Sequence, residues 1–295
     1  MNKNLKRNIK KLVANILGGK SIVPLLYFDY FRTYKRILDL SDPKTFGAKI
    51  HWIKKYGNIE RYKDLVDKYR VREYIEQMIG DKYLVKLYGV YESTSEINID
   101  NLPNSFVLKC NQGSGEVIIC KDKSRFDWNK ARKLLDEWIE IDYYSITKEV
   151  QYKDIERRII CEEYLEDESG SLRDYKIFCF NGVPKYIQVD SDRFSDHKRD
   201  FYNNNWEKIE LKAKYKNSNY VIKRPDNLDE MLNVAEKLSK NFEFIRVDLY
   251  CSNNKVYFGE LTFTPDNGCA PYEPYEKDLE IAAMIDLNKY NSYMK

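Results

Sequence analysis

The part of the chain that most constrains the fold is residues 244–262, which have the pattern of two antiparallel strands carrying charged side chains in an apolar setting. Arg246 and Asp248 lie two apart on the first strand, and Glu260 and Thr262 lie two apart on the second. Side chains two apart share a face. Carboxylates among Val, Tyr, Phe and Leu are costly to desolvate unless a cation compensates them. Mg²⁺ takes one or two carboxylates and completes its shell with water and phosphate oxygens, so the hairpin predicts a magnesium site for nucleotide chemistry.

The length of the turn decides whether the two acids face each other. A three-residue turn at 252–254 (Ser-Asn-Asn) pairs Asp248 with Phe258 and leaves Glu260 on the diagonal of the same face. A two-residue turn at 253–254 places the acids on opposite faces, because a slip of one residue reverses every side chain. We predict the three-residue turn. The alternative is a surface hairpin whose acids are simply solvated.

Composition disfavours several kinds of chemistry. The 295-residue chain has 50 basic and 47 acidic residues and a formal net charge of +3, so it has no general field for a polyanion and we predict no nucleic-acid partner. Two histidines, His51 and His197, make histidine-based metal or triad chemistry a poor expectation. The six cysteines lack Cys-x-x-Cys spacing, which predicts reduced core residues of a cytoplasmic protein. They are Cys110, Cys120, Cys161, Cys179, Cys251 and Cys269.

The first twenty residues have the pattern of a basic amphipathic helix. No acid precedes Asp29, and no apolar run approaches the roughly 18 residues needed to cross a bilayer. Such a helix suits an anionic membrane at the inner face of the plasma membrane, or equally it packs on the protein body or a partner. Its two faces are Leu5, Ile9, Leu12, Val13, Ile16 and Leu17, and opposite them Lys3, Lys6, Arg7, Lys10 and Lys11.

Helices and strands then alternate with antiparallel pairs, which predicts an α+β fold. The region 1–60 is expected to be mainly helical, and Asn181-Gly182 is the strongest hairpin turn signal. The predicted helices are 62–79, 128–141 and 228–241, and the predicted strands are 83–91, 106–110, 117–120, 159–165, 174–180 and 183–189.

One strand ends in a lysine next to a glycine-containing loop. Lys109 precedes Gly113, Ser114 and Gly115, and glycines let backbone N–H groups approach phosphate oxygens closely. The spacing is not that of a Walker loop, and an ordinary hairpin is the competing interpretation.

Other charged residues at strand ends could contact a nucleotide. Glu162 or Glu163 could accept a hydrogen bond from an adenine amine, although a strand running into an exposed acidic loop has the same pattern. Asp174 and Lys176 share a face and suit ribose and phosphate, and Arg193 could contact a transferring phosphoryl group. Surface ion pairs would look the same.

Taken in order, these segments resemble the TupA-like ATP-grasp family, named for teichuronopeptide synthesis and found among bacterial surface-polysaccharide genes. The resemblance runs from about Ser41 to Ile285. Thr262 stands where the wider superfamily commonly has asparagine, and Gln112 where a histidine is expected. The residues that carry the resemblance are Asp67-Lys68-Tyr-Arg-Val-Arg-Glu-Tyr, Phe106-Val-Leu-Lys109-Cys-Asn-Gln-Gly-Ser-Gly115, Arg173-Asp-Tyr-Lys176-Ile-Phe, Arg246-Val-Asp248 and Gly259-Glu-Leu-Thr-Phe-Thr-Pro265.

The resemblance implies an ATP-grasp fold, in which a β-rich lid closes over ATP against a larger α+β lobe. It implies the divisions 1–60 (helical N-terminal region), 61–104 (first lobe), 105–162 (lid) and 163–295 (central lobe with the metal site). By position, Lys68 and Lys109 would contact phosphates, and Glu162, Glu163 and Leu165 adenine. Asp174 would contact ribose, Asp248 and Glu260 one or two Mg²⁺ with Thr262 in the place of the third ligand, and Arg246 the transferring phosphoryl group.

The implied reaction is an ATP-dependent ligation of a carboxylate to an amine through an acylphosphate. The expected substrates are a uronic acid of a free or lipid-linked saccharide and an amino acid or other amine. Two alternatives remain open. Asp190-Ser-Asp192 has the Asp-x-Asp pattern of a glycosyltransferase. A non-catalytic nucleotide-binding module would carry many of the same residues.

Overall fold

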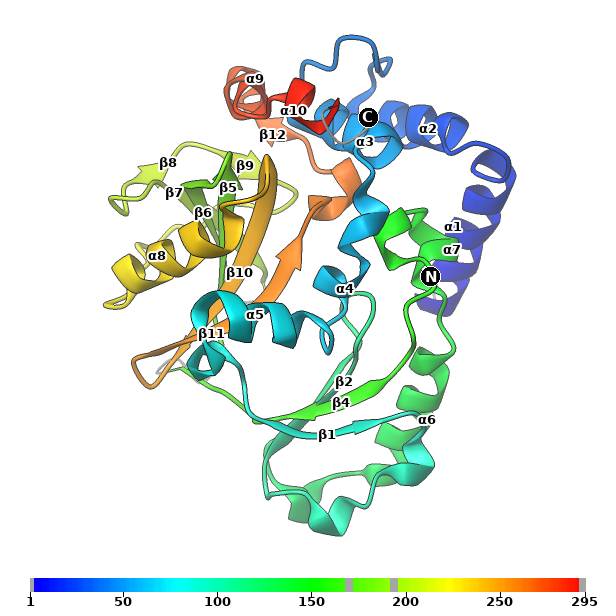
Figure 1. The fold of residues 1–295 in the computed structure, drawn as a ribbon, viewed down its shortest axis with the longest axis vertical. Coiled ribbons are helices and arrows are strands. Elements are labelled where there is room, and N and C mark those ends of the chain that lie inside the picture. The colour runs from blue at the N-terminus through cyan, green and yellow to red at the C-terminus, as the bar shows by residue number, and fades with distance from the viewer. Residues whose placement is uncertain (1–2, 168–171, 192–195, 292–295) are drawn as a thin grey trace.

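A computed structural model of the chain describes residues 3–167, 172–191 and 196–291 (Figure 1). Within these ranges the α-helices are α1 (Lys3–Leu17), α2 (Val23–Tyr34), α3 (Phe46–Tyr56), α4 (Lys63–Val66), α5 (Val71–Ile79), α6 (Trp128–Ile139), α7 (Tyr143–Thr147), α8 (Leu228–Ser239), α9 (Tyr275–Ala283) and α10 (Leu287–Asn291). Side-chain caps set several of their starts. Thr45 accepts a hydrogen bond from the Ala48 N–H at α3, and Asp127 accepts one from the Lys130 N–H at α6.

The larger sheet is antiparallel, with strand order β11-β10-β5-β6-β7-β8. Helix α8 packs against β5, β6 and β10 (Figure 1). Residues of the helix and of these strands belong to the main apolar core. The opposite face of the strands carries charged side chains. The strands are β5 (Asp174–Phe180), β6 (Val183–Ser191), β7 (Lys198–Tyr202), β8 (Lys208–Ile209), β10 (Phe244–Ser252) and β11 (Lys255–Thr262).

The smaller sheet has strand order β1-β4-β2-β3, also antiparallel, and its own core, to which Leu135 of α6 contributes. Its strands are β1 (Leu87–Tyr91), β2 (Phe106–Cys110), β3 (Val117–Cys120) and β4 (Ile159–Glu162). Strand β1 comes from the predicted first lobe and the other three from the predicted lid, so the division at 104 stays a prediction. A two-stranded pair joins β9 (Lys212–Ala213) to β12 (Tyr272–Glu273).

The predicted helix over 62–79 is wrong in one respect, because the chain breaks at residues 67–70 between α4 and α5. The side chain of Asp67 accepts hydrogen bonds from the N–H groups of Tyr69 (2.8 Å) and Arg70 (3.2 Å), and so turns the chain there. The break places Lys68 in a turn beside the glycine-containing loop, where its N–H bonds the carbonyl of Asn111.

The predicted three-residue turn between the last two long strands is also wrong. Ser252 pairs with Lys255, so the turn is the two-residue Asn253-Asn254, and both asparagines adopt positive φ. A β-bulge then inserts Gly259 as an extra residue, because Leu249 pairs with Phe258 whereas Asp248 pairs with Glu260. The two-residue turn alone would place Asp248 and Glu260 on opposite faces of the sheet. The bulge returns them to the same face.

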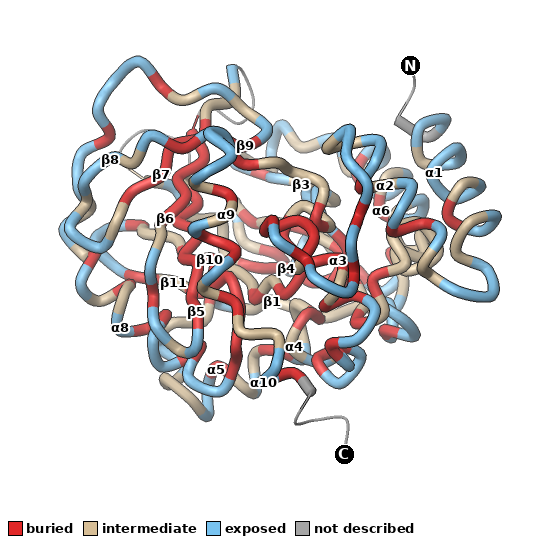
Figure 2. The backbone as a smooth tube through the Cα atoms, turned by 90° about the horizontal axis from the view of Figure 1, so that it is seen from above, coloured by how far each residue is buried: buried red, intermediate tan, exposed pale blue. Residues whose placement is uncertain are grey.

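Helix α1 lies at the periphery of the molecule, with its outer side exposed (Figure 2). It packs on α7 and α2, with Ala14 buried. In the part of the chain that the structure describes, no helix combines the length and apolar character that a membrane crossing requires.

Candidate functional site

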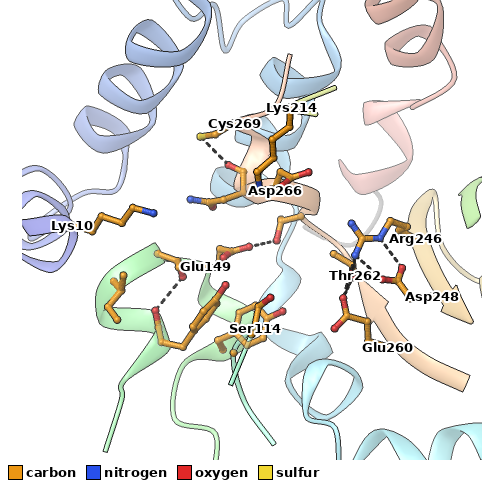
Figure 3. A pocket seen from close by; sticks show the side chains of 18 of the residues that line it. Lys10, Ser114, Glu149, Lys214, Arg246, Asp248, Glu260, Thr262, Asp266 and Cys269 are labelled. Atoms are coloured by element: carbon orange, nitrogen blue, oxygen red, sulfur yellow. Dashed lines mark hydrogen bonds and ion pairs between the residues drawn. The ribbon is translucent and has the colours of Figure 1, made fainter. Parts of the chain in front are cut away.

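A cleft of about 760 Å³ separates the charged face of the large sheet from the smaller sheet and the N-terminal helices. Glycine-loop residues and Lys109 form one wall, and α1, α2 and α7 contribute to the other end. Figure 3 shows Arg246, Asp248, Glu260 and Thr262 gathered on one side of this cleft.

The register of the large sheet lines up the charged side chains in rows. Asp248 pairs with Glu260 on one side and with Lys176 on the other. The next row contains Asp174, which pairs with Asp190. Because paired and alternate residues share a face, these side chains all project into the cleft.

Three oxygens converge on one nitrogen of Arg246. Its Nη2 donates to Asp248 Oδ2 (2.8 Å), Glu260 Oε1 (3.1 Å) and Thr262 Oγ1 (3.1 Å), while its Nε donates to Asp248 Oδ1 (2.6 Å). Lys176 Nζ also bonds Asp248 Oδ2 and lies 3.4 Å from Asp174 Oδ2. The carboxylates of Asp248 and Glu260 therefore lie close together, as the predicted shared ion requires.

The cluster favours the charged forms of Glu260 and Arg246, whereas burial raises the pKa of Asp248. Burial acts to raise the pKa of Glu260, but Lys176, Arg246 and Lys68 outweigh it and bring that pKa to about 2. Burial acts to lower the pKa of Arg246, but Asp248 and Glu260 outweigh it and raise it. The Glu260 carboxylate is thus ionised at neutral pH.

The glycine-containing loop faces this cluster across the cleft. Gly113 and Gly115 have φ of +77° and +86°, which glycine adopts without strain. Lys68 Nζ donates to the carbonyl of Gly113 (2.6 Å), and burial lowers the pKa of Lys68. Lys68, Lys109, Gly113, Ser114 and Gly115 all line the cleft.

A family profile described as TupA-like ATPgrasp matches residues 48–286. The chain belongs to the TupA-like ATP-grasp family. Membership confirms the predicted resemblance and the α+β ATP-grasp fold. Among curated protein sequences, none matches the chain.

Solved structures give the following similarities. D-alanine–D-alanine ligase from Bacillus anthracis with ATP is 13% identical over 90% of this chain and 84% of its own (TM-score 0.47). N5-carboxyaminoimidazole synthetase from Staphylococcus aureus with ADP is 14% identical over 75% of this chain (TM-score 0.45). L-amino acid ligase from Bacillus licheniformis is 13% identical over 70% of this chain (TM-score 0.43). The chain spans 51% of the synthetase and 44% of the L-amino acid ligase.

The TupA-like hairpin fits a divalent ion in its donor set. Asp248 Oδ2, Glu260 Oε1 and Thr262 Oγ1 already surround one point at 2.8–3.1 Å, and Mg²⁺ bonds oxygen at about 2.1 Å. Arg246 Nη2 lies at this point. Among the described residues no group of three or more His, Cys, Asp and Glu side chains could hold a metal, so water and phosphate oxygens would complete the shell.

The predicted adenine contacts Glu162, Glu163 and Leu165 are not among the described residues that line the cleft, although Glu162 contacts one that does. The Glu162 carboxylate pairs with Lys109 Nζ (2.6 Å), and the Glu163 N–H donates to the carbonyl of Lys86 (2.9 Å). Their adenine role stays a prediction. Arg193 lies outside the described residues.

A second charged cluster lines the same cleft; Asp190 was noted from the sequence, but Arg199 and Lys214 were not. Arg199 forms a bidentate pair with Asp190 (2.7 and 3.2 Å), and its Nη1 lies 3.3 Å from Asp266. Lys214 Nζ bonds the other oxygen of Asp266 at 2.7 Å. Arg199 pairs with Asp190 across the β6–β7 hairpin. This pairing could be predicted only if the register of the two strands were known.

A buried polar network supports the turn that carries Asp266. Thr264 bonds Glu149 and accepts a hydrogen bond from Gln151 (2.7 Å), although these residues lie more than a hundred positions away. Asp266 and Asn267 both have positive φ, and Lys54 Nζ holds the Asn267 side chain at 2.5 Å. The network keeps an otherwise strained turn at the edge of the cleft.

Gln112, the other departure from the expected pattern, has a structural contact. Its Nε2 donates to the carbonyl of Ile141 (2.6 Å), and the residue is buried. It therefore ties the glycine-containing loop to the segment after α6.

Proposed function

We propose that the protein is an ATP-dependent carboxylate–amine ligase. One observation carries the proposal: a family-typical hairpin gathers Asp248, Glu260 and Arg246 on one wall of a cleft, and Lys68 and Lys109 line the other. Such a site has acids for a magnesium ion and cations for a triphosphate. It contains no histidine among its acid and base groups apart from His197 at the Asp190 end.

In the proposed reaction, a substrate carboxylate attacks the γ-phosphate of ATP, giving an acylphosphate and ADP. An amine then attacks the acyl carbon, the C–O bond to phosphate breaks, and phosphate leaves. Bound Mg²⁺ would supply charge neutralisation at the phosphate oxygens. Arg246 would stabilise charge on the transferring group, and Lys68 and Lys109 would hold the remaining phosphates.

We propose a uronic-acid carboxyl of a bacterial surface saccharide as the acceptor and an amino acid or amino sugar as the donor of the amine. Membership of the TupA-like family supports this assignment. Basic side chains elsewhere in the lining of the cleft, three of them paired with acids, are compatible with an anionic saccharide. They are Lys10, Arg32, Arg199 and Lys214.

The test is ATP consumption across a panel of uronic acids and amino acids, with ADP, phosphate and the amide measured together. Hydroxylamine in place of the amine should trap the acylphosphate as a hydroxamate. Asp248→Asn and Glu260→Gln should each lower turnover by about 10²-fold or more, because each removes a charge placed at the transferring phosphate. Asp226→Asn, an exposed acid, is the matched control and should retain turnover. Undiminished turnover in the first two variants would remove the basis of the proposal.

The two alternatives differ from the ligase in what they consume. A glycosyltransferase would hydrolyse a nucleotide sugar without ATP, and Asp190, which would be part of its metal site, is engaged by Arg199. Asp192 lies outside the described residues. A non-catalytic module would bind ATP and release no ADP with any acceptor of the panel.

A further inference from the structure

Exposed large apolar side chains concentrate at the N-terminal helices. Of the fifteen such side chains among the described residues, eight lie between residues 5 and 37, about a ninth of the chain. Isolated exposed apolar residues are ordinary, but a concentration of this kind marks an interaction surface. The eight are Leu5, Ile9, Leu12, Ile16, Tyr27, Phe28, Phe31 and Ile37.

On α1 the exposed apolar residues form one stripe along the helix. Leu5, Ile9, Leu12 and Ile16 follow the spacing of a single helical face, and Leu12 and Ile16 are 60% and 69% exposed. The stripe is not the face that holds α1 to the protein. That contact uses another side, where Ala14 is buried against the neighbouring helices.

Helix α2 carries a second stripe beside the first. Tyr27, Phe28 and Phe31 are exposed on one side of it, while Leu25, Leu26 and Tyr30 are buried on the other. Ile9 of α1 and Phe28 of α2 both line the cleft. Each stripe therefore has a residue at the cleft, and helices α1 and α2 contact each other; we call the two stripes together the N-terminal face.

The charge around the N-terminal face is strongly positive. Between residues 5 and 36 there are eight basic residues and one acid, Asp29, which pairs with Arg32 at 3.5 Å. Most of the basic side chains are exposed, whereas the chain as a whole is nearly neutral. Exposed apolar stripes bordered by basic side chains complement an anionic lipid surface, in which the apolar groups enter the acyl boundary and the cations meet the headgroups.

We propose that α1 and α2 together dock the protein on an anionic lipid bilayer. The stripe of α1 inserts at the headgroup boundary, and Phe31 of α2 belongs to the same contact. Neither helix lies within residues 48–286, the part matched by the family profile. The N-terminal face therefore lies outside the matched residues, although Ile9 and Phe28 line the cleft.

Docking would place the end of the cleft that α1 and α2 line next to the membrane. Figure 3 shows Lys10 extending from α1 towards the cleft, and Arg7 ties α1 to the glycine-containing loop through Glu116 at 3.1 Å. An acceptor saccharide on a lipid carrier would then enter from the membrane side. This consequence, unlike the docking itself, rests on the proposed function.

The test is co-sedimentation of the full chain with vesicles of phosphatidylcholine alone or mixed with phosphatidylglycerol, without nucleotide. We expect binding to the mixed vesicles and little to the neutral ones. The double variant Leu12→Ser/Ile16→Ser should bind at least about tenfold more weakly, and Phe31→Ser should also bind more weakly. Lys6→Gln/Lys11→Gln should lose about fivefold per charge. None of these side chains lines the cleft.

The matched control is Val183→Ser/Val221→Ser, which removes exposed valines from another part of the surface and should bind as the parent does. Circular dichroism establishes that each variant is folded. Equal binding by the Leu12/Ile16 variant, or binding without regard to anionic lipid, would overturn the proposal. A concentration-dependent dimer that this variant abolishes, with no vesicle binding by the parent, would also overturn it and assign the face to a second copy. Vesicle binding is measured without ATP, so its failure and the failure of the ligase assignment are separate results.

Discussion

Gly259 offers a direct test of how the bulge positions the two acids. A methyl group at this residue would lie 2.9 Å from Tyr250 Cε2 and 3.0 Å from the carbonyl oxygen of Asp248. The tyrosine ring can turn aside, but the carbonyl oxygen belongs to the paired strand. Gly259→Ala should therefore displace the backbone at Asp248 and, with it, the carboxylate that meets Glu260.

The size of the effect follows from two opposing contributions. Overpacking by one methyl group costs about 1–3 kcal/mol of unfolding free energy. The lower entropy of the unfolded alanine chain offsets about 0.4–1 kcal/mol of this. We expect a net loss of about 1–2 kcal/mol. Turnover is more sensitive, since a misplacement of about 1 Å in such a site can cost about 10²-fold.

Urea unfolding and ATP turnover, measured on the same preparations, separate these effects. Gly80→Ala is the matched control, because Gly80 has φ of +93°, lies outside the cleft, and has no other atom within 4 Å of the point that an alanine methyl group would occupy. It should lose about 1–3 kcal/mol from backbone strain, because φ of +93° with ψ of 157° is a conformation that essentially only glycine adopts, and keep its turnover. If Gly259→Ala equals the parent in turnover, or if Gly80→Ala loses as much, the bulge does not position the acids.

Two further predictions concern single buried groups. Burial raises the pKa of Asp278 from 3.8 to about 6, so the folded chain retains this proton between those values and its stability falls as pH rises through them. Asp278→Asn can still accept a hydrogen bond from the Phe46 N–H. In urea titrations it should lessen the loss of unfolding free energy between pH 4 and pH 7 by about 2 kcal/mol. An unchanged pH profile would contradict the raised pKa of Asp278. Lys68→Met should raise the KM for ATP by about ten- to a hundredfold in steady-state assays, because a charged hydrogen bond contributes about 1.5–3 kcal/mol. The exposed Lys82→Met is its control, and an equal KM in both variants would exclude Lys68 from ATP binding.

The sequence correctly predicted that Asp248 and Glu260 share a face of the sheet, but the turn on which that prediction depended was wrong. Alternation along the strands was correct, but the turn was one residue shorter than expected and Gly259 compensated. A glycine inside a strand pattern is a known signal of a bulge. Its effect on register could not be fixed from the sequence, because a bulge and a longer turn have the same consequence for the facing of the two acids.

Local pattern also failed where a side chain competed with the helix. Apolar spacing continues through 62–79, yet Asp67 accepts hydrogen bonds from two backbone N–H groups and from the side chain of Asn111 (2.9 Å) in the glycine-containing loop. Such a break depends on a partner more than forty residues away. The order of motifs still identified Lys68, because position in the family pattern does not depend on whether the residue lies in a helix or a turn.

Arg199 and Glu149 show a different reason why part of the site stayed hidden. Each is defined by contacts with distant segments: Arg199 with Asp190 and Asp266, and Glu149 with Thr264. Neither residue has a local pattern that distinguishes it from a surface charge. Their burial, which the fold alone decides, is what separates them from the chain's many exposed Lys and Glu residues.

Neighbouring basic side chains compensate the charges of the hairpin acids, so these acids do not need a metal ion in order to be buried. From the sequence, magnesium was the predicted cation that compensates the buried acids. In the structure, Arg246 and Lys176 already neutralise two of the three charges on Asp174, Asp248 and Glu260. The acids can therefore be buried before an ion binds. An ion held by Asp248 and Glu260 together with phosphate oxygens would supply the remaining positive charge. In the proposed reaction Arg246 would then have two roles, pairing with the acids and stabilising charge on the transferring phosphate.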